Sequence, residues 1–328
     1  MNIRRKFLVA LGAGALAFAA PPGSFGQQQV KVRRVGFLSL SAASLNSPYA
    51  NAFLKGMREL GYVEAKNLVV EWRFADGKLE RLPGLAAELV QLNVDVIVAG
   101  GSPAISAAQK ATSTIPIVMA SAGDPVGSGF VKSLARPGGN ITGLSVMSGD
   151  TGAKLLELLR SVVPKLSRVA MLTPSTTYGA ISKGVQAAAQ KAGVKTLVAE
   201  ASTAQEIENA FSMMVREKAD AVIVGSPTTF AQERRQIAEL ALKYQMPSMF
   251  QDRVYVEVGG LISYGQKFTD SYERSATYVD KILKGVKSGD LPVEQPVSFE
   301  LVVNLKTAKA LGVTIPQTIL LRADEVIQ

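Results

Sequence analysis

Short apolar runs alternate with longer segments of helical periodicity along most of the chain. The first run, 32–40, is followed by a segment from about Tyr49 to Leu60 whose apolar residues recur at helical spacing and which ends at Gly61. Four further apolar runs follow, at 67–72, 94–98, 115–119 and 141–146, and a second helical segment lies at 79–92. Strands that alternate with helices predict a parallel, doubly wound sheet of the α/β class.

The same order of elements begins again in the second half of the chain. Residues 168–172 (RVAML) resemble 34–38 (RVGFL), and Asp220–Val224 resembles Asp95–Ala99, each with a Gly-Ser-Pro sequence shortly after it. Corresponding positions lie about 125–135 residues apart, which is the size of a domain rather than of a solenoid repeat. Any two α/β domains share some of this texture by chance, but the ordered recurrence favours two similar lobes.

The last 60 residues or so do not follow the pattern that the two domain-sized halves share. The pattern there predicts an amphipathic helix at 269–284, a turn, a strand at 296–303 and a short helix at 305–311. Such a tail can cross back to the first lobe and create a hinge. We therefore expect lobe 1 to contain 30–145 plus about 267–295, and lobe 2 to contain 146–266 plus about 296–328 with the tail.

The first 26 residues have the three regions of a secretory signal peptide. Arg4, Arg5 and Lys6 precede an apolar stretch at 7–20, and Ala17-Phe18-Ala19 offers the small residues that a signal peptidase requires. The apolar stretch is short for a membrane span. We expect removal of 1–26 and a periplasmic mature protein. The paired arginines resemble a twin-arginine signal, although Ile3 departs from that pattern, so the export route stays open.

Composition excludes several classes of chemistry. The chain has no histidine and no cysteine, which rules out Ser-His-Asp, Cys-His and histidine-based zinc sites. The formal charge is +9, but the basic residues are scattered and do not alternate with aromatics, so nucleic-acid binding is not expected. We also expect no cofactor and no metal.

Polar residues follow the predicted strands in both lobes. Ligands of parallel sheets bind at the carboxyl ends of strands, where helix N-termini gather. We predict a ligand-binding cleft from these residues of the two lobes: Ser39, Ser41, Asn46, Ser102, Asp124, Ser175, Tyr178, Ser226, Thr228, Asp252 and Tyr264.

Each candidate also has a structural alternative. Ser102 and Ser226 are equally suited to capping the helices that follow them, and Asp124 in Gly-Asp-Pro to forming a turn. Arg253, next to Asp252, is either a ligand group or a surface charge. Tyrosines such as Tyr49 and Tyr264 either stack on a ligand ring or pack in the core.

The sequence resembles the type I periplasmic-binding-protein superfamily. Specifically, it is similar to the ABC transporter substrate-binding family whose characterised relatives bind aromatic amino acids. The motifs that carry this resemblance are GMRELGY at 56–62, GDPVG at 123–127, LARPGGNITG at 134–143, YVDKILKG at 278–285, DLPVEQP at 290–296 and LKTAKALGVTIP at 305–316.

The resemblance implies a periplasmic receptor that delivers a small-molecule solute to an ABC permease, with Asp124 and the loop at Ser102-Pro103 in the pocket. The chain departs from the family pattern at 225–229 and 251–255, so the ligand class stays open between amino acids and small organic acids. We expect a monomer. The alternatives are a two-lobe α/β enzyme, which lacks a phosphate loop here, and a repressor's effector domain, which requires a helix-turn-helix before the first strand.

Overall fold

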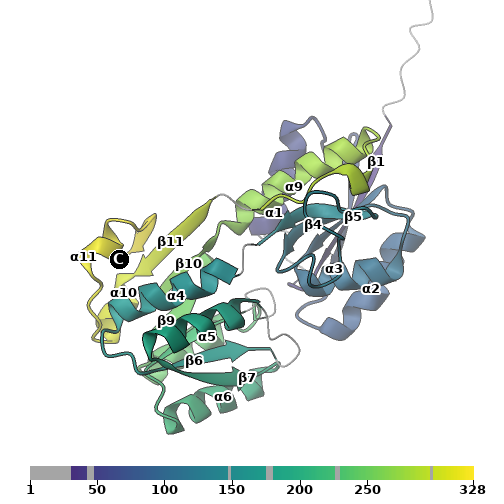
Figure 1. Ribbon diagram of the computed structural model, residues 1–328. Coiled ribbons are helices and arrows are strands. Elements are labelled where there is room, and N and C mark those ends of the chain that lie inside the picture. Colours follow the sequence, from purple (N-terminus) through teal and green to yellow (C-terminus); the bar gives the residue numbers. More distant parts are fainter. Residues whose placement is uncertain (1–30, 43–47, 147–148, 175–179, 226–229, 296–297) are drawn as a thin grey trace, which may run out of the picture. The chain divides into compact units, whose positions relative to one another are not determined.

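Two β-sheets form the framework of the chain (Figure 1). The computed structural model describes residues 31–42, 48–146, 149–174, 180–225, 230–295 and 298–328. By its internal contacts Val32–Gln328 is one unit that contains both sheets. Helices connect most of the successive strands within each sheet, so the predicted α/β class with two sheets is confirmed.

Five parallel strands form the first sheet, in the order β2-β1-β3-β4-β5. β3 and β4 are buried along their whole length, as expected for apolar strands that helices cover on both faces. The elements of this part are β1 (Arg33–Ser39), α1 (Pro48–Glu59), β2 (Leu68–Phe74), η1 (Leu79–Arg81), α2 (Leu82–Gln91), β3 (Val96–Gly100), α3 (Ser102–Ala111), β4 (Ile117–Ala122) and β5 (Ile141–Ser145).

The second sheet has the order β12-β11-β10-β9-β8-β6-β7. Its strands β6 to β10 pair in parallel and repeat the order of the first sheet. The elements are α4 (Gly149–Val162), β6 (Arg168–Thr173), α5 (Ala180–Ala192), β7 (Lys195–Glu200), α6 (Ala204–Arg216), β8 (Ala221–Val224), α7 (Arg234–Lys243), β9 (Ser248–Phe250), α8 (Arg253–Val256), β10 (Ile262–Gln266), β11 (Phe299–Asn304), α10 (Leu305–Ala310), α11 (Gln317–Leu320) and β12 (Glu325–Ile327).

One strand of the second sheet runs against the others. β11 pairs antiparallel with β10, and Gln266 at the end of β10 lies opposite Phe299 at the start of β11. The chain leaves the second sheet after Gln266 and returns to it at Phe299, at the same end of the sheet. A strand that enters where its neighbour leaves must run in the opposite direction, so the otherwise parallel second sheet contains one antiparallel pair of strands.

The helix between these two strands belongs to the first sheet. α9 (Phe268–Leu283) packs beside α1 and against β3, β4 and β5 (Figure 1). Its apolar stripe, which includes Tyr272 and Val279, is buried in one cluster with Phe53 of α1. The two helices approach closely at Gly56, where an added Cβ would lie 2.5 Å from the backbone oxygen of Glu273.

The segment after α9 is fixed to the first sheet before it returns to the second. It contains η2 (Ser288–Asp290), and Glu294 forms a parallel bridge with Leu144 of β5. The backbone N–H of Glu294 donates to Gly143 O at 3.0 Å, and its carbonyl accepts from Ser145 N at 2.9 Å. Its carboxylate accepts two hydrogen bonds of 2.9 Å from the Arg274 guanidinium. The chain thus passes between the sheets three times: after β5, after β10 and before β11.

Gly143 in β5 should be intolerant of a side chain. Its φ is +127°, and an added Cβ would lie 2.3 Å from Met119 O on the neighbouring strand. We expect Gly143→Ala to lower the free energy of unfolding by about 1–3 kcal/mol through backbone strain. Gly84→Ala is the control, because nothing lies within 4 Å of that position in α2, and alanine should stabilise the helix by up to about 1 kcal/mol. Urea unfolding at constant m-value measures both, and equal midpoints would contradict the expectation.

Candidate functional site

A cavity of about 330 Å³ lies where strand ends from both sheets meet. Ser39 and Gly100 end β1 and β3 of the first sheet, and Asp252 follows β9 of the second. This is the position at which open α/β sheets bind ligands. The residues that line the cavity are Ser39, Leu40, Ser41, Ala42, Pro48, Tyr49, Gly100, Phe268 and Tyr272 beside the first sheet, and Ala231, Gln232, Arg234, Asp252, Val254, Glu257 and Val258 beside the second.

Aromatic rings form one wall of the cavity. The rings of Tyr49, at the start of α1, and Tyr272, in α9, are stacked with centroids 5.0 Å apart and planes at 19°. Phe268 meets Tyr49 edge-on at 6.3 Å. Phe37 of β1 supports Tyr272 from behind at 5.9 Å, and Gly100 leaves space for the Tyr272 hydroxyl, since a Cβ there would lie 2.3 Å from it. The wall therefore offers flat, apolar surface at fixed positions.

A buried carboxylate lies next to this wall. Asp252 is 7% exposed, and its Oδ2 accepts a short hydrogen bond from the Tyr49 hydroxyl. Its Oδ1 accepts from Val254 N at 3.2 Å and thereby caps the one-turn helix α8. Because Tyr49 belongs to α1 and Asp252 follows β9, this bond joins the two sheets across the cavity.

The ionisation of these groups follows from their burial. Burial raises the pKa of Asp252, and the hydrogen bonds from Tyr49 and from Val254 N oppose that shift. The pKa of Tyr49 is well above its ordinary value, first because of burial and then because of the Asp252 charge. Burial likewise raises the pKa of Tyr272 to about 12. Both hydroxyls therefore stay protonated at neutral pH, and that of Tyr49 donates to Asp252.

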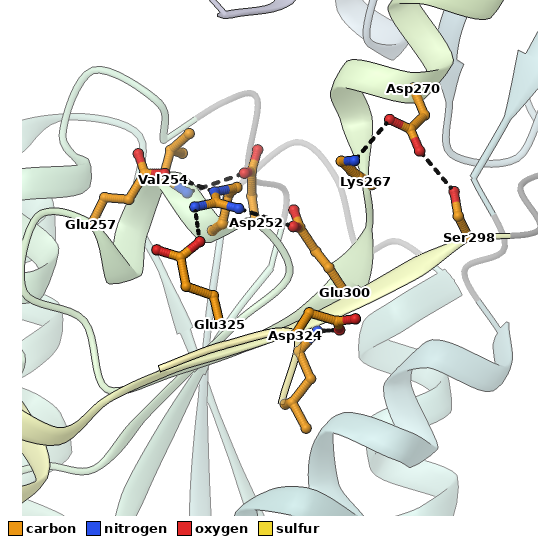
Figure 2. Close-up of polar contacts among 11 residues, drawn as sticks. Asp252, Val254, Glu257, Lys267, Asp270, Ser298, Glu300, Asp324 and Glu325 are labelled. Atoms are coloured by element: carbon orange, nitrogen blue, oxygen red, sulfur yellow. Dashed lines mark hydrogen bonds and ion pairs between the residues drawn. The ribbon is translucent and has the colours of Figure 1, made fainter. Parts of the chain in front are cut away.

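The neighbouring Arg253 is occupied by carboxylates. Its guanidinium donates to Glu257 at 2.7 Å, to Glu300 at 3.2 Å and also to Glu325, and the three carboxylates converge in Figure 2. Burial lowers the pKa of Arg253, but the hydrogen bonds to Glu257 and Glu325 outweigh it and raise the pKa. Arg253 thus ties α8 to β11 and β12, and its side chain is not among those that line the cavity.

The structure brings three predicted site residues together and places three others elsewhere. Ser39, Ser41 and Asp252 line the cavity, and the two serine hydroxyls lie 2.9 Å apart. Ser102, the first residue of α3, accepts a hydrogen bond from Gly123 N at 3.3 Å and is not a lining residue; the residue that caps α3 is Gly101.

Asp124 and Tyr264 also lie outside the lining of the cavity. Asp124 is exposed and its Oδ1 accepts from Gly127 N at 2.8 Å within its own turn. The ring of Tyr264 stacks on Phe299 at 5.6 Å. The remaining predicted residues lie outside the described part of the chain, and they are Asn46, Ser175, Tyr178, Ser226 and Thr228.

Several lining residues were not among the predicted site residues. The sequence pattern places Tyr272 on the buried stripe of its helix, which is true, but it does not reveal that the same ring also faces a cavity. Phe268, Gln232, Arg234 and Glu257 carry no local signal, because they reach the cavity only through the way α7, α8 and α9 are placed. Tyr49 was noted as a stacking candidate without being assigned to the site.

Metal and membrane features are not found in the described residues. Within these ranges there is no group of three or more Asp, Glu, His or Cys side chains that could hold a metal ion. No helix within the described ranges has the length and apolar character to cross a membrane.

Two similar sheets that present strand ends to a shared cavity define a two-lobed solute-binding protein. The family model for ABC transporter substrate-binding proteins matches residues 40–327, and the chain belongs to this family. The family resemblance seen in the sequence is therefore confirmed, and so is the function class: the chain is an extracytoplasmic solute receptor of an ABC transporter. The family is one of transport proteins.

Individual relatives agree with this assignment. The chain is 26% identical over 284 residues to the Tyrosine-binding protein of Clostridioides difficile. The aligned region covers 86% of this chain and 81% of that protein. It is similar to a Streptococcus pneumonia ABC domain solved in complex with L-Trp, with a TM-score of 0.83 and 27% identity over 90% of this chain and all of that chain. A conserved domain protein of Vibrio cholerae has the same TM-score at 29% identity, again over 90% of this chain and all of that one.

Loss of the Tyr49 hydroxyl should destabilise the protein. Tyr49→Phe leaves the buried Asp252 carboxylate with a single partner, so we expect the free energy of unfolding to fall by about 1–3 kcal/mol. Tyr264→Phe is the matched control and should change it by less than about 0.5 kcal/mol, because the ring stack on Phe299 is retained. Chemical unfolding measures the difference, and equal effects of the two substitutions would contradict the role assigned to the Tyr49–Asp252 bond.

Alkaline pH should weaken the fold. The pKa of Tyr272 rises from 10.0 to about 12 in the folded protein, and Tyr49 and Tyr255 shift in the same direction. Between pH 10 and about 12 the unfolded chain loses tyrosine protons that the folded chain keeps, so the free energy of unfolding falls as the pH rises. We expect unfolding and the ultraviolet absorbance of tyrosinate to increase together above pH 10. Full tyrosinate absorbance at pH 11 in a folded protein would contradict this expectation.

Proposed function

We propose that the chain is a periplasmic receptor that binds an aromatic amino acid or a small aromatic acid in the cavity and delivers it to its ABC permease. The single observation that carries this proposal is the stacked Tyr49–Tyr272 wall beside the buried Asp252. The wall suits a ligand ring, and offset or edge contacts between rings contribute about 0.5–1.5 kcal/mol beyond area burial. The names of the relatives, which mention tyrosine and L-Trp, support the same ligand class.

The size of the cavity supports a small ligand. Its volume of about 330 Å³ lies at the low end of the roughly 300–1,000 Å³ of small-molecule sites. Apolar and aromatic side chains dominate the lining, with a few polar groups such as Ser39, Ser41 and Asp252. This combination fits a single ring with a short polar side chain better than a sugar, whose many hydroxyls would need more polar partners.

Binding should be coupled to closure of two lobes. We propose the lobes of the sequence prediction, 30–145 with about 267–295 and 146–266 with about 296–328. The three chain crossings near Ser145, Gln266 and Phe299 provide the hinge. A ligand that contacts both walls of the cavity stabilises the closed arrangement by its differential contacts. A monomer is sufficient for this cycle, because both walls come from one chain.

Export is the remaining part of the proposal. The basic and apolar segments within 1–26 support a signal peptide, by the general or the twin-arginine route, and hence a periplasmic protein. Asn46, Ser175, Tyr178, Ser226 and Thr228 follow predicted strands of the two lobes, and their contact with ligand stays a prediction, as do the proposed contacts of Ser102, Asp124 and Tyr264.

Calorimetric titration of the mature protein tests the proposal. L-tyrosine, L-tryptophan and L-phenylalanine should bind and raise the melting temperature by mass action, whereas L-alanine and L-glutamate should not. Tyr272→Leu removes the ring and should weaken aromatic binding at least about tenfold, or about 1.4 kcal/mol. Tyr272→Phe retains the ring and is the control, with affinity within about threefold of the parent, or about 0.6 kcal/mol. Binding restricted to ligands without a ring would reject the proposal.

A further inference from the structure

Three charged side chains line the cavity, and the two carboxylates among them already accept hydrogen bonds from protein donors. The three side chains are Arg234, Asp252 and Glu257. A ligand must satisfy its own charges with groups that are not already committed, because a buried unpaired charge is costly. The existing partners of these three side chains therefore indicate which ligand charge the cavity can accept.

Asp252 is already committed within the protein. Both of its oxygens accept hydrogen bonds, one from the Tyr49 hydroxyl and the other from Val254 N. A ligand ammonium would have to share these oxygens or displace the Tyr49 hydroxyl, and with it the bond that joins the two sheets. The carboxylate is also buried, which disfavours its charged form. Asp252 is therefore a poor partner for an added ammonium group.

Glu257 is engaged through one of its two carboxylate oxygens. Its Oε1 accepts a hydrogen bond of 2.7 Å from Nε of Arg253. The same guanidinium also contacts Glu300 and Glu325, so the orientation of Glu257 is part of a larger ion-pair network (Figure 2). Turning Oε1 of Glu257 toward a ligand would break its hydrogen bond with Nε of Arg253.

Arg234 is the exception. It is the first residue of α7 and is half-buried, and Nη1 donates to the backbone oxygen of Ala231. Among the described residues it forms no ion pair with a carboxylate. A guanidinium has five N–H donors in a planar fork, so most of its capacity remains for a carboxylate, which it binds in two-point geometry. Gln232, on the same side of the cavity, adds an amide that can donate to the same group.

We propose that Arg234 anchors the ligand's carboxylate and that the solute is recognised as an aromatic carboxylate, to whose affinity an α-ammonium group contributes little. This inference rests on the proposed function and specifies the ligand class of the same site. It extends the accepted solutes from aromatic amino acids to aromatic acids that lack the amine.

The charge around Arg253 acts in the opposite direction. Three carboxylates surround this one guanidinium, so this cluster carries excess negative charge, which favours a ligand ammonium, although only Glu257 of the three lines the cavity. However, the Glu257 and Glu325 side chains are each 45% exposed, so water and salt screen their field. A direct contact with the half-buried Arg234 is screened less, and we expect it to decide specificity.

Two series of matched ligands separate the contributions of the ligand charges. In the phenol series these are L-tyrosine, 3-(4-hydroxyphenyl)propionate without the amine, and tyramine without the carboxylate. In the indole series they are L-tryptophan, indole-3-propionate and tryptamine. Calorimetry with the mature protein should give affinities within about tenfold for the two carboxylates of a series, or about 1.4 kcal/mol, and at least about hundredfold weaker binding for its amine, or about 2.7 kcal/mol.

Substitution of Arg234 tests the residue itself. Arg234→Gln should reduce the affinity for both carboxylates of a series equally, by at least tenfold, while Arg234→Lys should recover part of the loss because it retains the charge but not the fork. Arg235→Gln is the control, because Arg235 is the exposed neighbour in the same helix and does not line the cavity; it should leave affinity unchanged.

The outcomes distinguish the inference from the proposed function. Binding of the amino acids and amines but not of the propionates would overturn the inference and leave the proposed function intact. An Arg234→Gln variant that is folded and retains full affinity for the carboxylates would also overturn it. If no member of either series binds, the proposed function and the inference fail together.

Discussion

The hydrogen bond between the Tyr49 hydroxyl and the Asp252 carboxylate is the contact on which the site depends. It joins the start of α1, beside the first sheet, to the loop after β9 in the second. The same two residues define the chemical character of the cavity, because Tyr49 belongs to the aromatic wall and Asp252 is its buried charge. A donor that stays protonated and an acceptor that is capped by Val254 N make this contact specific in geometry as well as in charge.

Helix α9 makes this arrangement possible. It follows β10 of the second sheet but packs on the first, so Phe268 and Tyr272 lie near the point where the chain crosses between sheets. The close contact at Gly56 fixes α9 against α1 and thereby brings Tyr272 into a stack with Tyr49. Glu294, paired with Arg274 and bridged to Leu144, secures the return of the chain to the second sheet. The same helix thus carries part of the aromatic wall and follows one of the crossings that we propose as the hinge.

Arg253 illustrates how neighbours in sequence separate in function. It follows Asp252 directly, yet its side chain forms ion pairs with Glu257, Glu300 and Glu325 and contributes to the attachment of β11 and β12. The antiparallel β11 is held in the sheet by this network as well as by its ladder with β10. Arg234, which lies 19 positions earlier, reaches the cavity instead. Charge in a sequence therefore does not identify a ligand contact until the partners of each group are known.

Most of the architecture could be predicted from the sequence. The apolar runs located the five strands of the first sheet and β6, β8 and β11 of the second, and the helical stripe at 269–284 corresponds closely to α9. These patterns are local, since they reflect which face of each element is buried. Short elements such as α8, with four residues, and β12, with three, were missed because they contain too few residues for a period.

The sequence by itself determined the α/β class, the doubled sheet and three residues that line the cavity, Ser39, Ser41 and Asp252. These follow from strand ends, which are visible in a local pattern. Only the tertiary structure decided that Tyr272, Phe268 and Arg234 reach the same cavity, that β11 runs antiparallel, and that Ser102, Asp124 and Tyr264 lie outside the lining. The reason is physical: these outcomes depend on how distant helices pack on one another, and that packing leaves no periodic trace in the residues themselves.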